Sequence, residues 1–278
     1  MIWIVSILAA ILAVVTVIVV LSYAFAWYEG ANSRPALMAE RFSPSRLWLA
    51  VRLVGMETLF LFLDVLLHPL GWLPPKERQP AENVATPIIL LHGLFHNRAC
   101  WLWTKYRLRR RGFRSIYTLN LPPWQDVETL TERVAKKVDE LRHTLGIKKV
   151  CLVGHSMGGI IARNYLQIRG GEQKVERCIL LAAPNGGSKL APFALSPLGR
   201  LLIPGSEFLR RLALAPLPPE TELRAICSRH DNMVLPWEYG RFEGAHNIEL
   251  AGMGHVSLLY HPRAFKALCE ALTEGVPS

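Results

Sequence analysis

Two kinds of hydrophobic pattern divide the chain. From residue 88 onward, short apolar runs alternate with stretches in which apolar residues recur every three or four positions. The short runs are typical of buried strands, and the longer period is typical of helices that cover them. This alternation predicts an α/β fold, a mostly parallel sheet with helices on both faces. The expected strands lie near Ile88–Leu91, Ser115–Asn120, Lys149–Val153, Arg177–Ala182, Arg224–Cys227 and Asn247–Leu250, and the expected helices near Trp101–Arg111, Asp126–Leu145, Gly158–Gln167 and Pro262–Glu274.

The first apolar stretch predicts a transmembrane helix over residues 1–28. Residues 2–28 carry no charged side chain, and about 20 apolar residues cross the hydrocarbon layer as a helix. Trp3 and Trp27 lie towards its ends, as in the aromatic belts of membrane proteins. A cleavable signal peptide is the rival interpretation, because Ala24-Phe25-Ala26 imitates a cleavage site. Signal peptides have a basic start and a shorter apolar core, so a retained anchor is favoured.

A second hydrophobic helix is expected within residues 29–75, a membrane-proximal region. Its apolar stretch, Leu47–Trp72, contains Arg52, Glu57 and Asp64. Each ionised side chain at mid-bilayer costs about 3 kcal/mol, so a second span is disfavoured. A helix that lies on the membrane or packs against the folded domain fits better, and a two-helix anchor is the alternative.

Membrane orientation depends on the number of spans. Basic residues follow the first helix and none precedes it, so the positive-inside rule applies to this loop. With one span the folded domain lies on the cytoplasmic side, and with two spans it lies outside. The basic residues are Arg34, Arg41 and Arg46.

The polar, proline-containing residues 76–87 predict a linker, and residues 88–278 the folded domain. Within this domain, residues 185–222 lose the alternating pattern and combine prolines with apolar side chains. One interpretation is a helical excursion that packs on the domain. The other, which is favoured, is a cap or lid that borders an apolar substrate site.

The stretch from Val150 to Gly159 carries the strongest chemical signal. It is a short apolar run that breaks into Gly154-His155-Ser156-Met157-Gly158 and then a helical pattern. This is the G-x-S-x-G nucleophile elbow, in which the glycines admit a turn too sharp for a Cβ. Ser156 is therefore the expected nucleophile, at a helix start whose free N–H groups can stabilise an oxyanion.

A serine nucleophile needs a histidine base and a carboxylate that orients the base. After this elbow the partners follow in the order Asp or Glu, then His, each at the carboxyl end of a strand. Asp231 is the only Asp after Ser156, and it comes directly after an expected strand. His255 lies in a glycine-containing loop after the last strand, whereas His246 opens that strand and His261 leads into the last helix. Asp231 and His255 are therefore expected, with Glu249 as a weaker rival carboxylate.

An oxyanion hole needs two backbone donors, one after the nucleophile and one from the loop after the first strand. Met157 and Leu94 are the expected donors. His92 and His96, in the same loop as Leu94, are expected to brace it by hydrogen bonds. Metal binding by His92, His96 and His155 is an alternative that no acidic or thiol ligand supports.

Together these residues resemble the α/β-hydrolase superfamily and, within it, the small bacterial triacylglycerol lipases and related esterases. The resemblance covers roughly residues 85–275. It implies Ser156, Asp231 and His255 as the triad, Leu94 and Met157 as oxyanion donors, and no metal or organic cofactor. The motifs that carry it are His92-Gly93-Leu94, Gly154 to Gly159, Ala183 to Ser188, the Asp231 loop and Gly252 to Leu259.

Two departures from the family pattern limit the resemblance. The family places another glycine soon after the His-Gly-hydrophobic motif, where this chain has Phe95 and His96. The long hydrophobic front end is also absent from the minimal secreted lipases, so their substrates do not transfer directly.

Charge and composition indicate what the surface of the protein could contact. The net charge of +10 and the basic run Lys105–Arg114 indicate either a solvated helix face or adhesion to anionic lipid headgroups, at about 1 kcal/mol per basic residue. Nucleic-acid binding is disfavoured because no recognised module accompanies the charge. The five cysteines show no metal-site or disulfide spacing.

The sequence thus predicts a membrane-anchored serine hydrolase of acyl esters, with lipids as the expected substrates. It is expected in a bacterial inner membrane, with a single-pass or two-helix anchor. The alternatives are a thioesterase or acyltransferase with the same triad, and a membrane-tethered interaction protein that uses the fold without turnover.

Overall fold

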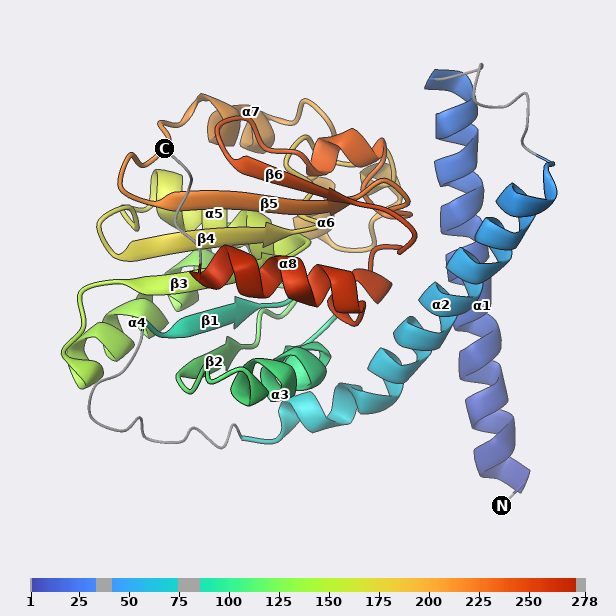
Figure 1. Cartoon of the computed structure of the whole chain (residues 1–278), viewed down its shortest axis with the longest axis horizontal. Coiled ribbons are helices and arrows are strands. Elements are labelled where there is room, and N and C mark those ends of the chain that lie inside the picture. The colour runs from blue at the N-terminus through green and yellow to red at the C-terminus, as the bar shows by residue number, and fades with distance from the viewer. Residues whose placement is uncertain (1, 34–41, 75–85, 274–278) are drawn as a thin grey trace.

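Six parallel strands form the sheet on which the molecule is built (Figure 1). The computed structural model describes residues 2–33, 42–74 and 86–273. Strand order is β2-β1-β3-β4-β5-β6, and every neighbouring pair is parallel, which confirms the predicted fold class. The strands are β1 (Ile88–Leu91), β2 (Ile116–Leu119), β3 (Val150–His155), β4 (Val175–Leu181), β5 (Glu222–Ser228) and β6 (His246–Leu250), all within a few residues of the predicted ranges.

Both faces of the sheet are buried, because alternate residues of the central strands point into two separate apolar clusters. Ile89 and Leu91 belong to the cluster beneath α4 (Val127–Leu145) and α5 (Met157–Ile168). Ile88 and Leu90 belong to the cluster beneath α3 (Leu102–Arg110) and α8 (Pro262–Thr273). This explains why the strands read as continuous apolar runs rather than as an alternating pattern.

The ends of the predicted helix α4 are set by its sequence. The Asp126 side chain accepts a hydrogen bond of 2.8 Å from the Thr129 N–H, and so caps the first turn. Gly146 ends the helix in the left-handed region, at a φ of 63° that favours glycine.

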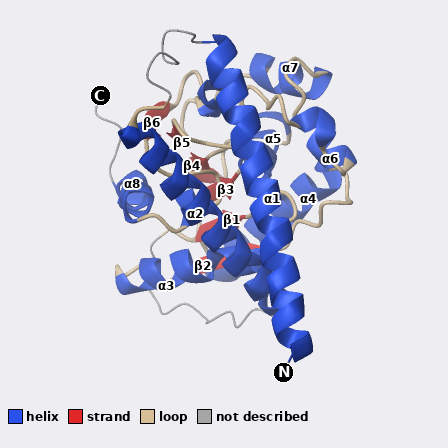
Figure 2. Ribbon diagram, turned by 90° about the vertical axis from the view of Figure 1, so that its right-hand side faces the viewer, coloured by secondary structure: helices blue, strands red, loops and turns tan. Residues whose placement is uncertain are grey.

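Two N-terminal helices lie at the edge of the sheet to which the carboxyl ends of the strands point (Figures 1 and 2). They are α1 (Ile2–Ser33) and α2 (Pro44–Leu67), and the short 3₁₀ helix η2 (His68–Trp72) continues α2. Val15, Val19 and Tyr23 of α1 pack with Leu53 of α2 in a small apolar cluster. Of the three interpretations of the second apolar stretch, packing against the folded domain is the one that the contacts of α2 match, because Glu57 accepts hydrogen bonds from Val256 and Ser257.

Among the described helices, α1 is the one with the length and apolarity to cross a membrane. Its most apolar window has a mean hydropathy of 3.2, and 11% of that window is buried. Most of the expected linker, residues 76–87, lies outside the described residues, as do Arg34 and Arg41 of the loop used for orientation.

The segment between β4 and β5 folds into short helices. They are η4 (Ala191–Phe193), α6 (Pro197–Arg200) and α7 (Glu207–Leu214). Leu198, Leu209 and Leu212 are buried in the cluster on the α4 and α5 face, so the excursion packs on the domain. A Cβ at Gly199 would lie 3.0 Å from the Leu94 side chain, so α6 also borders the loop after β1.

Candidate active site

Ser156 lies at the turn between β3 and α5, and its backbone has the strained conformation expected of a nucleophile elbow. Its φ is 53° and its ψ is −124°, values that a residue with a side chain adopts only under constraint. The close packing of the turn explains the flanking glycines. A Cβ at Gly154 would lie 2.5 Å from the Gly158 carbonyl oxygen, and one at Gly158 would collide with the Leu91 carbonyl oxygen.

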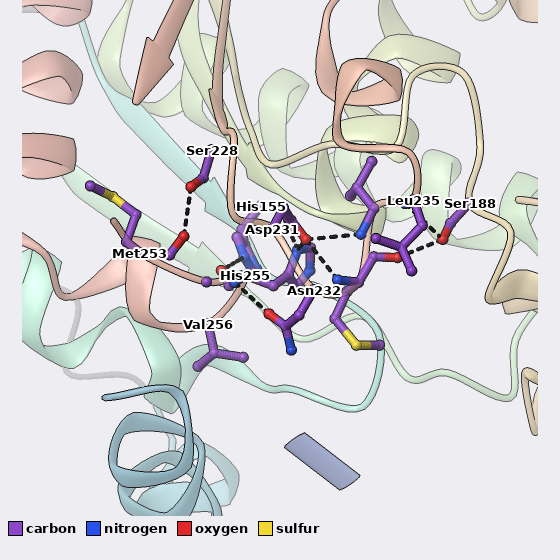
Figure 3. Close-up of polar contacts among 12 residues, drawn as sticks. His155, Ser188, Ser228, Asp231, Asn232, Leu235, Met253, His255 and Val256 are labelled. Carbon is purple, nitrogen blue, oxygen red and sulfur yellow. Dashed lines mark hydrogen bonds and ion pairs between the residues drawn. The ribbon is translucent and has the colours of Figure 1, made fainter. Parts of the chain in front are cut away.

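Asp231 and His255 come together from the ends of β5 and β6 (Figure 3). The His255 Nδ1 lies 2.9 Å from Asp231 Oδ2. Asp231 Oδ1 also accepts hydrogen bonds of 2.8 Å from the N–H groups of Met233 and Val234, which fix the carboxylate. Because a carboxylate accepts, Nδ1 carries the proton of the neutral ring and Nε2 is left with a lone pair that can accept one.

The surroundings of His255 favour its charged form. Burial alone lowers the pKa of its imidazole, but the Asp231 carboxylate, the hydrogen bond to it and the nearby Glu57 charge outweigh burial and raise the pKa above its usual value. A base with a raised pKa accepts a proton readily.

His155 connects the strand that carries Ser156 to the loop that carries His255. Its Nε2 donates a 3.1 Å hydrogen bond to the His255 carbonyl oxygen, and the two ring centroids are 4.8 Å apart. Burial lowers the pKa of His155 well below its usual value, so the ring is neutral. In the described residues no hydrogen bond joins Ser156 Oγ to His255, and catalytic hydrogen bonds often tighten only with substrate.

Two serines hold the loops that carry Asp231 and His255 (Figure 3). Ser228 Oγ donates a 2.6 Å hydrogen bond to the Met253 carbonyl oxygen, which ties the end of β5 to the His255 loop. Ser188 Oγ donates one of 2.5 Å to the Met233 carbonyl oxygen. A serine hydroxyl therefore holds each of the two loops that carry Asp231 and His255.

The loop after β1 lies directly against the elbow. A Cβ at Gly93 would lie 2.9 Å from the Ser156 Cβ, which shows how closely this loop approaches the serine. Leu94 follows Gly93, and Met157 follows Ser156. The two residues predicted to donate to an oxyanion thus stand on the two segments that meet at the serine.

The predicted bracing of this loop by His92 is confirmed. His92 Nδ1 donates to the Gly93 carbonyl oxygen at 2.9 Å, and Nε2 accepts from the Leu121 N–H at 2.8 Å. Burial lowers the pKa of His92 to about 4, so the ring stays neutral. His96 instead contacts a carboxylate of α2, with its Nδ1 2.5 Å from Asp64 Oδ2.

The rival candidates from the sequence, Glu249 and His246, lie away from the Asp231–His255 pair. Glu249 forms ion pairs with Arg229 and Arg241 on the outer strand β6. His246 opens that strand and is exposed. Among the described residues, no group of three His, Cys, Asp or Glu side chains is arranged to hold a metal ion.

Sequence reasoning missed the contributions of the N-terminal helices. Asn232 Oδ1 accepts a 3.0 Å hydrogen bond from the His255 N–H, and its Nδ2 donates one of 2.7 Å to Ser22 Oγ of α1. Glu57 of α2 binds the loop that follows His255. Glu57 appeared in the sequence only as a charge that disfavoured a second span, and spacing gives no signal for contacts across about 200 residues.

A cavity of about 510 Å³ lies between α1, α2 and the loop after β5. Its lining is mostly apolar and includes Tyr23, Trp27, Leu53 and Trp237. It reaches Asp231 from the side of the N-terminal helices.

Comparison with known proteins agrees with this architecture. A family model described as the alpha/beta hydrolase family matches residues 88–228, just over half of the chain. Among solved structures, a lipase of Bacillus licheniformis in its mature form superposes with a TM-score of 0.62 at 21% identity, over 70% of this chain and 96% of that one. Lipase B of Aspergillus fumigatus has a TM-score of 0.61 at 19% identity, over 72% and 55%.

Curated relatives match over shorter stretches. The triacylglycerol lipase of Pseudomonas fragi is 29% identical over 114 residues, 39% of this chain and 38% of that protein. The human (lyso)-N-acylphosphatidylethanolamine lipase is 28% identical over 95 residues, 31% of this chain and 27% of that protein. The chain thus spans well under half the length of these relatives.

Proposed function

The chain belongs to the α/β hydrolase family, and we propose that it is a membrane-anchored serine hydrolase that cleaves carboxylic esters of lipids. Ser156 is the nucleophile, His255 the general base and acid, and Asp231 the carboxylate that orients His255. The N–H groups of Leu94 and Met157 stabilise the oxyanion.

The observation that carries the proposal is the backbone of Ser156. A serine held at a φ of 53°, with a glycine two residues away on each side, is costly by about 1 to 3 kcal/mol, and such strain persists where the surrounding structure maintains it for function. The buried Asp231–His255 pair, on neighbouring strands of the same sheet edge, supports the same conclusion. In sheets of this kind, ligands bind outside the carboxyl ends of the strands, near the point where strand order reverses. Here that point lies between β1 and β3.

The proposed reaction has two halves. Ser156 Oγ attacks the ester carbonyl carbon while His255 Nε2 takes the hydroxyl proton, and the tetrahedral oxyanion is held by the two backbone donors. The intermediate collapses, the C–O bond to the alcohol breaks, and His255 gives its proton to the departing alkoxide oxygen. Water then attacks the acyl-enzyme, His255 takes its proton, and collapse releases the carboxylic acid and returns the proton to Ser156.

Three features support a lipid ester at a membrane. The apolar α1 has the length of a bilayer span and lies at the sheet edge that carries the proposed site. Apolar side chains of the 185–222 segment, among them Phe193 and Leu195, are exposed, as a cap over an acyl chain requires. Phe193 also contacts Phe25 of α1, with ring centroids 5.5 Å apart. Relatives that share part of the sequence are lipases of triacylglycerol and of N-acylphosphatidylethanolamines.

The decisive test compares the wild type with Ser156→Ala in detergent, on a short-chain p-nitrophenyl ester. We expect hydrolysis to fall by about 10⁴-fold or more, since the residual rate would come from binding and the oxyanion hole alone. A fluorophosphonate probe should label the wild type and leave Ser156→Ala unlabelled. Unchanged hydrolysis in the variant would reject Ser156 as the nucleophile, and a wild type inert to both ester and probe would favour an interaction protein.

A panel of lipid classes then tests the substrate. We expect release of fatty acid from glycerolipid esters in mixed micelles, and no release by Ser156→Ala. Turnover confined to small soluble esters would reject the lipid assignment while leaving the hydrolase in place.

A further inference from the structure

Two carboxylates of α2 are buried, although the helix is otherwise mostly apolar. Glu57 is 1% exposed and Asp64 is 4% exposed. A buried carboxylate is strongly destabilising unless hydrogen bonds or charges compensate it, so both residues need partners. Those partners lie in loops of the proposed active site.

Glu57 binds the loop that carries His255. Its Oε1 accepts a hydrogen bond of 2.6 Å from the Val256 N–H, and its Oε2 accepts one of 2.9 Å from the Ser257 N–H. These donors open the short helix η6 (Ser257–Leu259), where backbone N–H groups have no partner within the helix. A carboxylate from a different part of the chain thus caps the turn directly after His255. In Figure 3 the pale blue helix beside Val256 is α2.

The approach of the helix is close enough to restrict the sequence of the loop. A Cβ at Gly254 would collide with Glu57 Oε2 and with the Tyr23 hydroxyl of α1. A side chain at this position, directly before His255, would therefore have to displace Glu57 or Tyr23. The loop is held on one side by Glu57 and on the other by Asn232, which accepts from the His255 N–H.

We propose that Glu57 is a positioning residue for His255: by binding the N–H groups of Val256 and Ser257, it holds the loop so that the imidazole stands between Asp231 and Ser156. The inference rests on the proposed function. It makes the N-terminal helices part of the active site rather than an anchor alone, because without α2 the loop loses two charge-assisted hydrogen bonds.

The electrostatics of the loop give a readout that a purely structural role would not move. The charged and titratable groups around His255 are Asp231 after β5, Glu57 on α2 and the neutral His155 at the end of β3, with Tyr23 of α1 next to Glu57. Burial raises the pKa of Glu57, and its two backbone hydrogen bonds and His255 oppose that shift. The charge of Glu57 contributes to the raised pKa of His255.

The test uses the full chain in detergent, with Glu57→Gln and Glu57→Ala, and kcat and KM measured on a short-chain p-nitrophenyl ester across pH. We expect Glu57→Ala to lower kcat by about ten- to a hundredfold with KM within about twofold, because a small displacement of a catalytic group is that costly. Glu57→Gln keeps one acceptor oxygen, so its loss of kcat should be smaller.

The pH dependence gives a second readout. Hydrolysis needs neutral His255, so kcat/KM rises with pH through the pKa of His255, which forms the acid limb of the pH profile. Loss of the Glu57 charge lowers that pKa, so the acid limb of Glu57→Gln should move to lower pH.

Leu53→Ala is the matched control. Leu53 is also buried on α2, but it packs against α1 and makes no hydrogen bond to the His255 loop. It should lower the melting temperature while leaving the acid limb in its wild-type place. If Glu57→Ala does not fold, the nearly isosteric Glu57→Gln decides.

Two results would overturn the proposal. The first is a Glu57→Gln variant whose kcat and acid limb both equal those of the wild type. The second is a loss of kcat in the Glu57 variants that Leu53→Ala reproduces, with the acid limb of the Glu57 variants unmoved. Ser156→Ala separates this from a failure of the proposed function. An inactive Ser156→Ala beside fully active Glu57 variants rejects only the role of Glu57, whereas an active Ser156→Ala rejects the function itself.

Discussion

The two N-terminal helices differ in the chemistry that they bury, although both are long and apolar. In α1 the buried residues are Val15, Val19, Ser22 and Tyr23, and its remaining surface is largely exposed aliphatic and aromatic side chains. In α2 the buried residues are Leu53 and the carboxylates Glu57 and Asp64. One helix thus exposes what a bilayer would cover, and the other inserts charges that only a folded domain can bind.

This difference is the basis for proposing separate roles for the two helices. An exposed apolar surface as extensive as that of α1 is stable in water only when something covers it, and lipid fits its length. The carboxylates of α2 instead contact loops of the proposed site, Glu57 beside His255 and Asp64 at His96. We therefore propose that α1 supplies attachment to the membrane and that α2 supplies support for the proposed active site.

The largest expected effect concerns attachment, and the double variant Val14→Arg, Val17→Arg tests it. Both valines are more than half exposed, on the α1 surface that does not pack against α2. Each arginine at mid-bilayer costs about 3 kcal/mol, so the protein should move from the carbonate-washed membrane fraction to the soluble fraction. Ester hydrolysis after solubilisation should stay at the wild-type level.

The matched control places the same charges on α2, as Leu47→Arg, Val51→Arg. These side chains are 48% and 64% exposed, respectively. We expect this variant to remain in the membrane fraction. If it is released as completely as the α1 variant, then α2 also lies in the bilayer and the contrast between the helices is lost.

The parts of the molecule that local pattern determines could be predicted from the sequence. The strands were found because both of their faces are buried, so that Ile88–Leu91 and Val150–Val153 read as unbroken apolar runs. The Gly154 to Gly158 motif located the elbow, because the turn permits no Cβ at either glycine. The predicted cap and the roles of the triad residues stay predictions.

The support of the site could not be predicted, because it depends on contacts between distant segments. Nothing near Glu57 in the sequence distinguishes it from a charge that a surface helix exposes to water. Its partners are about 200 residues away, at Val256 and Ser257. His155 was considered only as a metal ligand, yet its hydrogen bond to the His255 carbonyl oxygen exists only once β3 and the loop after β6 are side by side.

A smaller effect is expected when Asp64 is removed from α2. Asp64 Oδ2 lies 2.5 Å from His96 Nδ1, and Oδ1 accepts a 3.2 Å hydrogen bond from the Tyr260 hydroxyl. In Asp64→Ala the Tyr260 hydroxyl loses its acceptor and the His96 ring loses its contact with a carboxylate, which should lower the free energy of unfolding by about 2 kcal/mol. Denaturant unfolding in detergent measures it. The neighbouring Leu63→Ala, at a 38% exposed position, should change the free energy of unfolding by no more than about 0.5 kcal/mol. Equal losses in the two variants would show that the carboxylate of Asp64 adds nothing beyond the packing of its side chain.

The smallest expected effect asks whether α1 is an anchor alone. Ser22 Oγ accepts a 2.7 Å hydrogen bond from Asn232 Nδ2, and Asn232 in turn accepts from the His255 N–H, so one hydroxyl of the apolar helix reaches the proposed base through a single side chain. Ser22→Ala leaves a buried amide donor without this acceptor and should cost about 1 kcal/mol of stability, with a fall in kcat of a few fold at most. Thr16→Ala is the control, because its hydroxyl bonds only to the Leu12 carbonyl oxygen on the exposed side of the same helix. If the two variants have the same melting temperature and kcat, then α1 contributes attachment only, and support of the proposed site comes from α2 alone. A loss confined to Ser22→Ala would show that α1 also helps to hold the loop of His255.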